Sequence, residues 1–165
     1  MDINGEIAAK GEVNMELMKY MMKHSYLKMK PPKTTGREDF GETYVNKILR
    51  EAHKMKITWE DIIATATYYT AKTISESYEK YLPEKPDEMV IGGGGSRNKT
   101  LIKMLMEQNP NMKISLHEDY GIPAQAKEPL VMVILANETI NGNPNNIPTA
   151  TGAKCRVIMG KIIPP

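Results

Sequence analysis

The sequence predicts a single α/β domain, residues 1–165, in which helices pack on a short parallel or mixed sheet. Three observations predict this class. Apolar residues recur at helical spacing through the first half of the chain, two short apolar runs flank a helical stretch in the second half, and a run of glycines directly follows the first of these strands. With 165 residues, 41% of them hydrophobic, the chain can bury a core without disulfides or structural metals.

The first elements are predicted from turn and proline signals. Residues 2–11 contain an Asn-Gly turn signal and are expected to form the tail of a hairpin or an entry loop. A helix is expected from the N-cap Asn14 to Leu27, and it must end before Pro31 because the residue preceding a proline is disfavoured in the α region. Residues 31–41 are expected to form a loop.

The clearest helix is predicted for residues 59–81. Its aromatic and aliphatic residues recur at steps of three and four, and Thr58 precedes two acidic residues in the first turn. Pro83 ends it. A shorter helix is expected just before it, over residues 42–55.

The second half of the chain is predicted to alternate strands and helices. The expected elements are a strand at 88–91, a helix from 97 or 98 to 108, a strand at 112–116, a helix at 124–139 and a terminal strand at 155–163. Only the first two strands are clear, and a two-stranded parallel sheet is not stable by itself. Either the terminal segments add strands or another chain completes the sheet.

Composition excludes several classes of protein. A net charge of +2 gives no electrostatic reason to expect a nucleic-acid or membrane partner. Cys155 is the single cysteine, and the three histidines lack the spacing of metal ligands, so no metal site is expected. No apolar run is long enough to span a bilayer, and the first residues do not form a signal peptide, which favours a cytoplasmic protein.

The strongest local signal is the glycine run that ends the strand at 88–91. Glycines between a strand and a helix let a ligand approach the backbone closely, although a plain strand-to-helix turn is the alternative. The run does not match a dinucleotide fingerprint. It departs from a P-loop at Asn98, where that motif requires glycine, so phosphate binding by Lys99 is rejected.

Two further polar motifs are candidates for function. The segment Thr35, Gly36, Arg37 and Glu38 offers a planar guanidinium, but taken alone it is better explained as a capped loop before a helix, with Arg37 and Glu38 a solvated pair. Glu128 is expected in the first turn of an otherwise apolar helix. Its position suits the helix dipole, so helix capping is favoured over ligand binding on physical grounds alone.

Together, these motifs resemble the anhydro-N-acetylmuramic acid kinase family of the sugar-kinase/Hsp70/actin superfamily. The resemblance covers nearly the whole chain. The matching segments lie at 2–11, 31–40, 61–74, 93–98, 119–121, 126–128, 142–145, 147–153 and 159–164.

This resemblance implies a fold and a partial enzyme. The fold would be the C-terminal portion of an actin-like (RNase H-like) ATPase lobe. Members of the family carry a Gly-Thr-Ser-x-Asp-Gly phosphate loop and an Asp-Thr-Gly-Pro-Gly-Asn segment with the catalytic aspartate, and neither pattern occurs here. The chain therefore looks like the C-terminal part alone, without the N-terminal phosphate-loop lobe, and no catalytic residue is assigned to it.

The resemblance also implies roles for residues. Gly93, Gly94, Gly95 and Asn98 would bind the adenosine side of ATP, and Glu128 would hold the sugar. The loop Thr35–Glu38 would lie near the cleft or a dimer contact. The completed enzyme would use ATP and Mg²⁺ to phosphorylate an anhydro amino sugar in cell-wall recycling. Its partner would be a chain with the N-terminal half or a homodimer mate.

Two alternatives of a different class remain open. The chain could be a non-catalytic module that keeps a nucleotide or sugar pocket, or an interaction domain that homodimerises to cover its open sheet. A partner with the phosphate loop and the aspartate would favour the kinase reading, whereas monodisperse behaviour without a partner would favour the other two.

Overall fold

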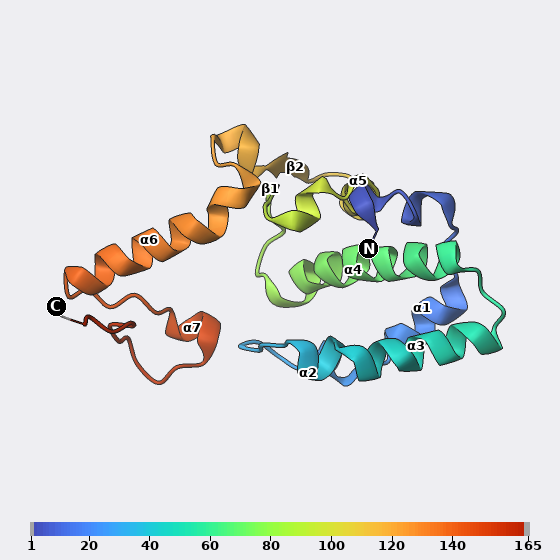
Figure 1. The fold of residues 1–165 in the computed structure, drawn as a ribbon, viewed down its shortest axis with the longest axis horizontal. Coiled ribbons are helices and arrows are strands. Elements are labelled where there is room, and N and C mark those ends of the chain that lie inside the picture. Colours follow the sequence, from blue (N-terminus) through green and yellow to red (C-terminus); the bar gives the residue numbers. More distant parts are fainter. Residues whose placement is uncertain (1, 164–165) are drawn as a thin grey trace.

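The computed structural model describes residues 2–163, and its central element is the long helix α4 (Trp59–Tyr81). Figure 1 shows α4 between two layers. Helices α1 (Met15–Met21) and α3 (Glu42–Lys54) lie on one side, and α5 (Lys99–Gln108) with the sheet lies on the other. This order confirms the α/β class and the predicted helices at 42–55 and 59–81.

Helix α4 begins where the sequence places its cap. The Thr58 hydroxyl accepts a hydrogen bond from the Asp61 amide at 3.2 Å, and acidic side chains occupy the first turn. The helix then contributes to both core clusters. Tyr69 packs with residues of α1 and α3, and Ala71 packs with Met89 and Leu105 on the sheet side.

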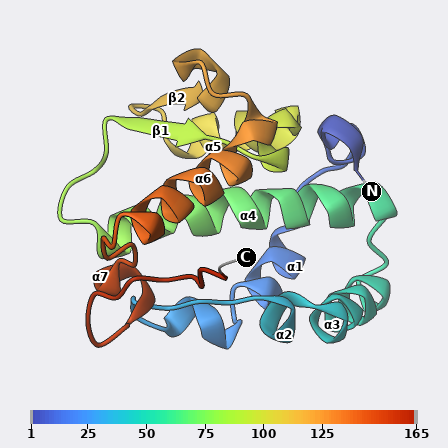
Figure 2. The same ribbon diagram turned by 60° about the vertical axis from the view of Figure 1, so that its left-hand side comes forward.

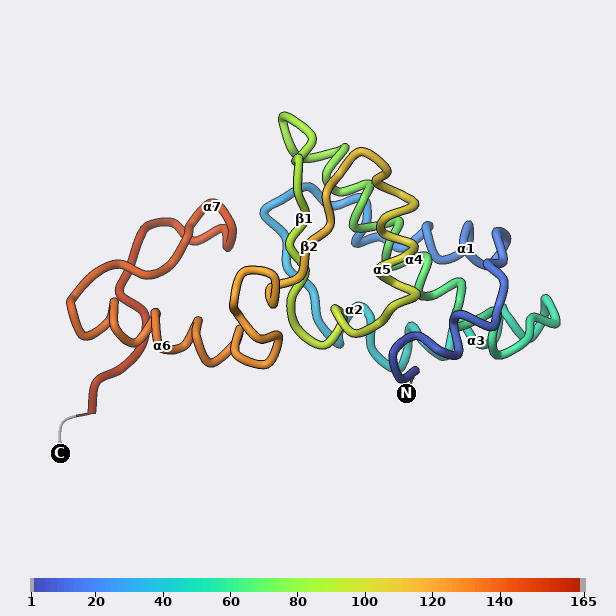
Figure 3. The backbone as a smooth tube through the Cα atoms, turned by 90° about the horizontal axis from the view of Figure 1, so that it is seen from above, coloured from blue at the N-terminus to red at the C-terminus, as the bar shows by residue number. Residues whose placement is uncertain are grey.

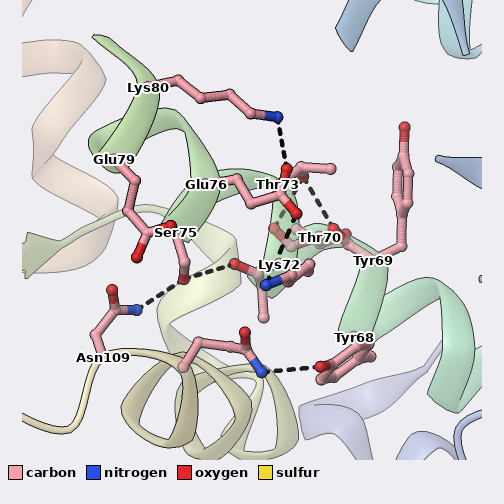
Figure 4. Close-up of polar contacts among 12 residues, drawn as sticks. Tyr68, Tyr69, Thr70, Lys72, Thr73, Ser75, Glu76, Glu79, Lys80 and Asn109 are labelled. Atoms are coloured by element: carbon pink, nitrogen blue, oxygen red, sulfur yellow. Dashed lines mark hydrogen bonds and ion pairs between the residues drawn. The ribbon is translucent and has the colours of Figure 1, made fainter. Parts of the chain in front are cut away.

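Polar side chains also join α4 to α5. The Asn109 side-chain amide donates to the Ser75 hydroxyl at 2.7 Å, a contact drawn in Figure 4. The Gln108 amide donates to the Tyr68 hydroxyl at 2.9 Å. Ser75 is buried, and its hydroxyl also donates to the Ala71 carbonyl at 2.9 Å, so this buried polar group is satisfied both as donor and as acceptor. These contacts hold the C-terminal end of α5 against α4.

The sheet consists of the parallel strands β1 (Glu88–Ile91) and β2 (Lys113–Leu116), paired from Glu88 opposite Lys113 to Ile91 opposite Leu116. Met89 faces the core, whereas Val90 on the other face is 44% exposed. Parallel sheets are normally covered on both faces. In the part of the chain that the structure describes, this sheet has one covered face and no further strand.

A C-terminal arm, residues 127–163, extends away from the layered part (Figures 1 and 3). It contains helix α6 (Lys127–Ile140) and the short helix α7 (Pro148–Thr151). No residue of α6 is buried. Helix α7 approaches the Pro31–Pro32 loop, as Figure 2 shows, and a Cβ at Gly152 would lie 3.5 Å from Pro32 Cγ.

The predicted terminal strand at 155–163 is wrong for the residues described. Two asparagine side chains take the backbone hydrogen bonds that a strand partner would supply. The Asn146 side chain accepts from the Val157 amide at 2.7 Å and donates to the Cys155 carbonyl at 2.9 Å. The Asn145 side chain accepts from the Met159 amide at 2.6 Å and donates to the Leu135 carbonyl at 2.9 Å. This asparagine clamp, Asn145 and Asn146, holds residues 155–159 against α6.

The Asn146→Ala substitution is expected to release that segment. Removing a buried hydrogen-bond partner costs about 1–3 kcal/mol, so amide exchange at Val157 should accelerate by at least about fivefold. Hydrogen–deuterium exchange read by mass spectrometry measures this. Asn143→Ala is the matched control, because the Asn143 side-chain amide donates only to the exposed Glu138 carboxylate, at 3.0 Å. Unchanged exchange at Val157 would contradict the clamp.

Three local predictions also need correction. Helix α1 ends at Met21 rather than Leu27, because the His24 side chain accepts from the Tyr26 amide at 3.3 Å and starts a separate 3-10 turn. Helix α2 (Arg37–Phe40) forms inside the expected loop. Of the two expectations for residues 2–11, a hairpin tail or an entry loop, the hairpin tail is wrong: the segment forms two 3-10 turns, since the Asp2 carboxylate accepts from the amides at positions 7 and 8.

Candidate functional site

The glycine turn, residues 92–95, lies where both parallel strands end. In open parallel sheets this carboxyl edge is where ligands bind. Gly93 has φ 81° and ψ −170°, a conformation that favours glycine. A Cβ placed on Gly93 or Gly94 would have no neighbour within 4 Å. Packing within the chain therefore does not require glycine at position 94, which leaves room for a ligand beside the backbone.

Asn98, predicted to bind nucleotide, also has a structural role. Its side-chain oxygen accepts from the Leu101 amide at 2.9 Å and caps α5. The same side chain packs against Gly5, and the Thr100 hydroxyl donates to the Gly5 carbonyl at 2.7 Å. The N-terminal segment thus braces the start of α5. The Asn98 backbone amide donates to the Gly95 carbonyl at 3.1 Å, whereas the side-chain nitrogen Nδ2 has no hydrogen-bond partner among residues 2–163 and is available to a ligand.

Glu128 lies in the first turn of α6 with an exposed side chain. Its carboxylate forms no hydrogen bond or ion pair within the described part of the chain, and no side chain caps α6. The capping role that the sequence favours for Glu128 is therefore limited to an interaction of its charge with the dipole of α6, without a hydrogen bond. The 3-10 helix η4 (Gly94–Arg97) contacts η6 (Ala124–Ala126), which directly precedes α6. This contact brings the glycine turn close to the segment that carries Glu128.

The loop Thr35–Glu38 is not part of this arrangement. Its residues are exposed and lie at α2, on the other side of α4 from the sheet (Figure 1). The Thr35 hydroxyl donates to the Asp39 carboxylate at 2.8 Å, which organises the start of α2. Glu38 lines a polar cavity of about 360 Å³ together with Lys23 and Lys47. A role for this loop at the cleft or at a dimer contact stays a prediction.

The layer of α1, α3 and α4 also carries an apolar groove of about 830 Å³. Aromatic side chains, including Tyr26, Phe40 and Tyr69, line it, together with Thr149 and Ala150 of α7. Burial raises the pKa of Tyr69 well above its ordinary value. None of the residues predicted to bind nucleotide or sugar lines this groove.

The sequence did not indicate a charged cluster that lies near the start of β1 and β2. The Glu88 carboxylate lies 2.8 Å from the Lys113 ammonium and accepts hydrogen bonds from the hydroxyls of Ser115 and Tyr120. These three donors lower the pKa of Glu88 to about 2, and the Lys113 ammonium makes the largest contribution to this shift. Glu88 and Lys113 lie opposite each other in the register of the sheet. The charged residues near the starts of the two predicted strands were therefore the sequence signal that could have indicated this pair.

This cluster predicts a pH dependence of stability. The ordinary pKa of the Glu88 carboxyl is 4.5, and folding lowers it to about 2. Its stabilising contribution is therefore fully present above pH 4.5 and is lost as the pH falls from 4.5 towards 2. Denaturant midpoints measured across this range should fall less steeply for Glu88→Gln than for the parent chain. Parallel slopes would contradict the assignment, and Glu84→Gln is an exposed control.

His117, which the sequence pattern gives no role, follows β2 directly and contacts Gly92. Only the tertiary structure shows this contact. Within residues 2–163, no group of three or more histidine, cysteine or acidic side chains is arranged to hold a metal ion. Over the same residues, no helix has both the length and the apolar character needed to cross a bilayer.

Comparison with known proteins gives one consistent match. A family model described as anhydro-N-acetylmuramic acid kinase matches residues 1–165. The curated kinase of this name from Caldanaerobacter subterraneus subsp. tengcongensis is 50% identical over 163 residues, covering 98% of this chain and 41% of that protein. The corresponding kinase from Bacillus cereus strain 03BB102 is 47% identical, covering 98% of this chain and 43% of that protein.

The match covers nearly all of this chain but less than half of each relative. The kinase from Bacillus anthracis strain A0248 repeats the pattern, with 46% identity over 98% of this chain and 43% of its own length. The identity over the full chain, in a segment that includes the glycine turn and Glu128, is far above the level at which only a fold is shared. This chain belongs to the anhydro-N-acetylmuramic acid kinase family.

Proposed function

We propose that this chain is the C-terminal portion of an ATP-dependent anhydro-N-acetylmuramic acid kinase and supplies part of its nucleotide and sugar cleft. Residues 1–165 then form one unit of an actin-like ATPase lobe. The observation that carries the proposal is the contact between η4 and η6. It brings the open glycine turn next to the segment leading to the unpaired carboxylate of Glu128 in a chain of this kinase family.

Each group has a chemical role in this proposal. Gly93, Gly94 and Gly95 let the adenosine side of ATP approach the backbone, and the Asn98 amide faces the nucleotide. The exposed Glu128 carboxylate accepts hydrogen bonds from sugar hydroxyls. ATP supplies the phosphoryl group that is transferred. Phosphoryl transfer also needs Mg²⁺ and a group that orients the attacking hydroxyl, and we assign both to the part of the kinase that this chain does not match.

We infer from the exposed apolar surface of helix α6 that this chain forms part of a larger assembly. Its residues 130–136 are apolar on every side of the helix, and Met132 and Val133 are each 65% exposed. A helix that is apolar all round is normally buried in a larger protein. The exposed face of the sheet at Val90 supports the same inference. We therefore propose that a partner, or the remainder of a longer chain, covers these surfaces.

The Gly94→Val substitution tests the nucleotide assignment. A Cβ at Gly94 meets no neighbour within 4 Å, and its φ is not positive, so the fold should tolerate valine. The side chain would occupy the space proposed for ATP. We expect Mg·ATP to bind at least about tenfold more weakly, a loss of roughly 1.4 kcal/mol, as measured by titration of amide resonances.

The control for this test places the same residue nearby. Lys103→Val puts valine on the exposed face of α5 and should change the affinity for Mg·ATP by less than about twofold, since surface substitutions usually matter little. Equal affinities of Gly94→Val and the parent chain would remove the glycine turn from the nucleotide site.

A further inference from the structure

His117 lies at the carboxyl end of β2, beside the glycine turn that ends β1. Its side chain is half-buried, and its Nδ1 atom is inaccessible to solvent. That atom has no hydrogen-bond partner among the described residues. Burying a ring nitrogen without a partner is unfavourable, so the position of this ring needs another explanation.

The explanation lies in the contact with Gly92. A Cβ built on Gly92 would lie 2.5 Å from His117 Nδ1 and 2.7 Å from Cε1. The imidazole therefore fills the volume that a side chain at position 92 would occupy, and it lies directly against the backbone. Because Gly92 has no positive φ, this contact alone requires glycine there.

The contact fixes one end of an otherwise open turn. Gly93 and Gly94 have no neighbour within 4 Å of a built Cβ, so nothing on that side restrains them. Farther along, the Ser96 hydroxyl donates to the Gly93 carbonyl at 2.8 Å, and the Asn98 side chain caps α5. The turn is thus held at its far end by these hydrogen bonds and at its near end by the His117 ring.

We propose that His117 is a positioning residue of the nucleotide site, which sets the glycine turn in its ligand-binding position by packing its ring against Gly92. This inference rests on the proposed function, because it takes the glycine turn to be the nucleotide site. The shape of the ring carries the role. The contact with Gly92 is steric and is made by the ring atoms Nδ1, Cε1 and Cγ, so a phenyl ring should replace the imidazole.

The test is a double-mutant cycle on the whole 165-residue chain, with Mg·ATP affinity and the amide resonances of residues 92–95 as readouts. Gly92→Ala overpacks the contact and His117→Ala removes the ring, and each should weaken Mg·ATP binding by about tenfold. The double variant should bind more tightly than Gly92→Ala alone, because the truncated histidine makes room for the new methyl group. His117→Phe should keep parental affinity.

The outcomes separate this inference from the function on which it rests. Parental affinity in His117→Ala, or a double variant that binds no better than Gly92→Ala, overturns the positioning role while the nucleotide assignment stands. A purely structural role would shift the unfolding midpoint of His117→Ala and leave its affinity for Mg·ATP unchanged, and this result also overturns the inference. Glycine resonances that do not respond to Mg·ATP, either in the parent chain alone or after the complementary part of a family kinase is added, overturn the nucleotide assignment itself.

Discussion

The purified 165-residue chain is expected to show no ATP-dependent phosphorylation of anhydro-N-acetylmuramic acid. Activity is expected only after addition of the part of a family kinase that this chain does not match, for example the uncovered part of the Bacillus cereus relative. The physical reason is that positioning and charge neutralisation account for most of phosphoryl-transfer catalysis. This chain contains neither the phosphate loop nor the aspartate segment of the family it resembles. A coupled assay of ADP release measures the effect.

Two controls sharpen this experiment. Glu128→Gln in the mixed assay should raise the KM for the sugar, because the amide keeps the size of the side chain but loses the charge that strengthens hydrogen bonds to sugar hydroxyls. The complementary part assayed alone should also be inactive. Turnover of the sugar by the single chain would refute the incomplete-cleft proposal, whatever the complementary part does.

The second large effect is expected at α6. Met132→Ser combined with Val133→Ser should weaken binding of the complementary part by at least about 100-fold. Burying each side chain contributes about 1.5–3 kcal/mol, and a loss of 3 kcal/mol corresponds to roughly this factor. Titration calorimetry with the complementary part measures the change, and circular dichroism checks that α6 still forms.

A matched pair of substitutions controls for exposure alone. Met15, in α1, and Met29, in the loop that follows the 3-10 turn at residues 25–28, are 55% and 50% exposed and lie outside residues 127–163. Met15→Ser combined with Met29→Ser should leave the affinity within about threefold of the parent, because surface changes outside an interface rarely matter. Equal losses in both double variants would show that α6 has no particular part in the association.

The local chemistry of the sequence predicted the elements whose signals are contained within one stretch of chain. Helix α4 follows from its apolar period and from the Thr58 cap, and β1 follows from four apolar-rich residues before the glycines. The length of helix α1 was overestimated, because its apolar stripe continues past Met21. The helix itself ends there, since the His24 side chain caps a separate 3-10 turn. The terminal strand failed for a related reason, since the asparagine clamp supplies the hydrogen bonds of residues 155–159.

The sequence by itself determined the α/β class, the glycine turn and the family to which its motifs point, because these depend on residue type and spacing. Only the tertiary structure decided which motifs meet. The contact of η4 with η6 brings the glycine turn towards Glu128, whereas Thr35–Glu38 lies beyond α4. The tertiary structure also revealed the packing of His117 against Gly92 and the ion pair between Glu88 and Lys113. These contacts join residues distant in sequence, so they depend on how helices and strands pack, which no local pattern encodes.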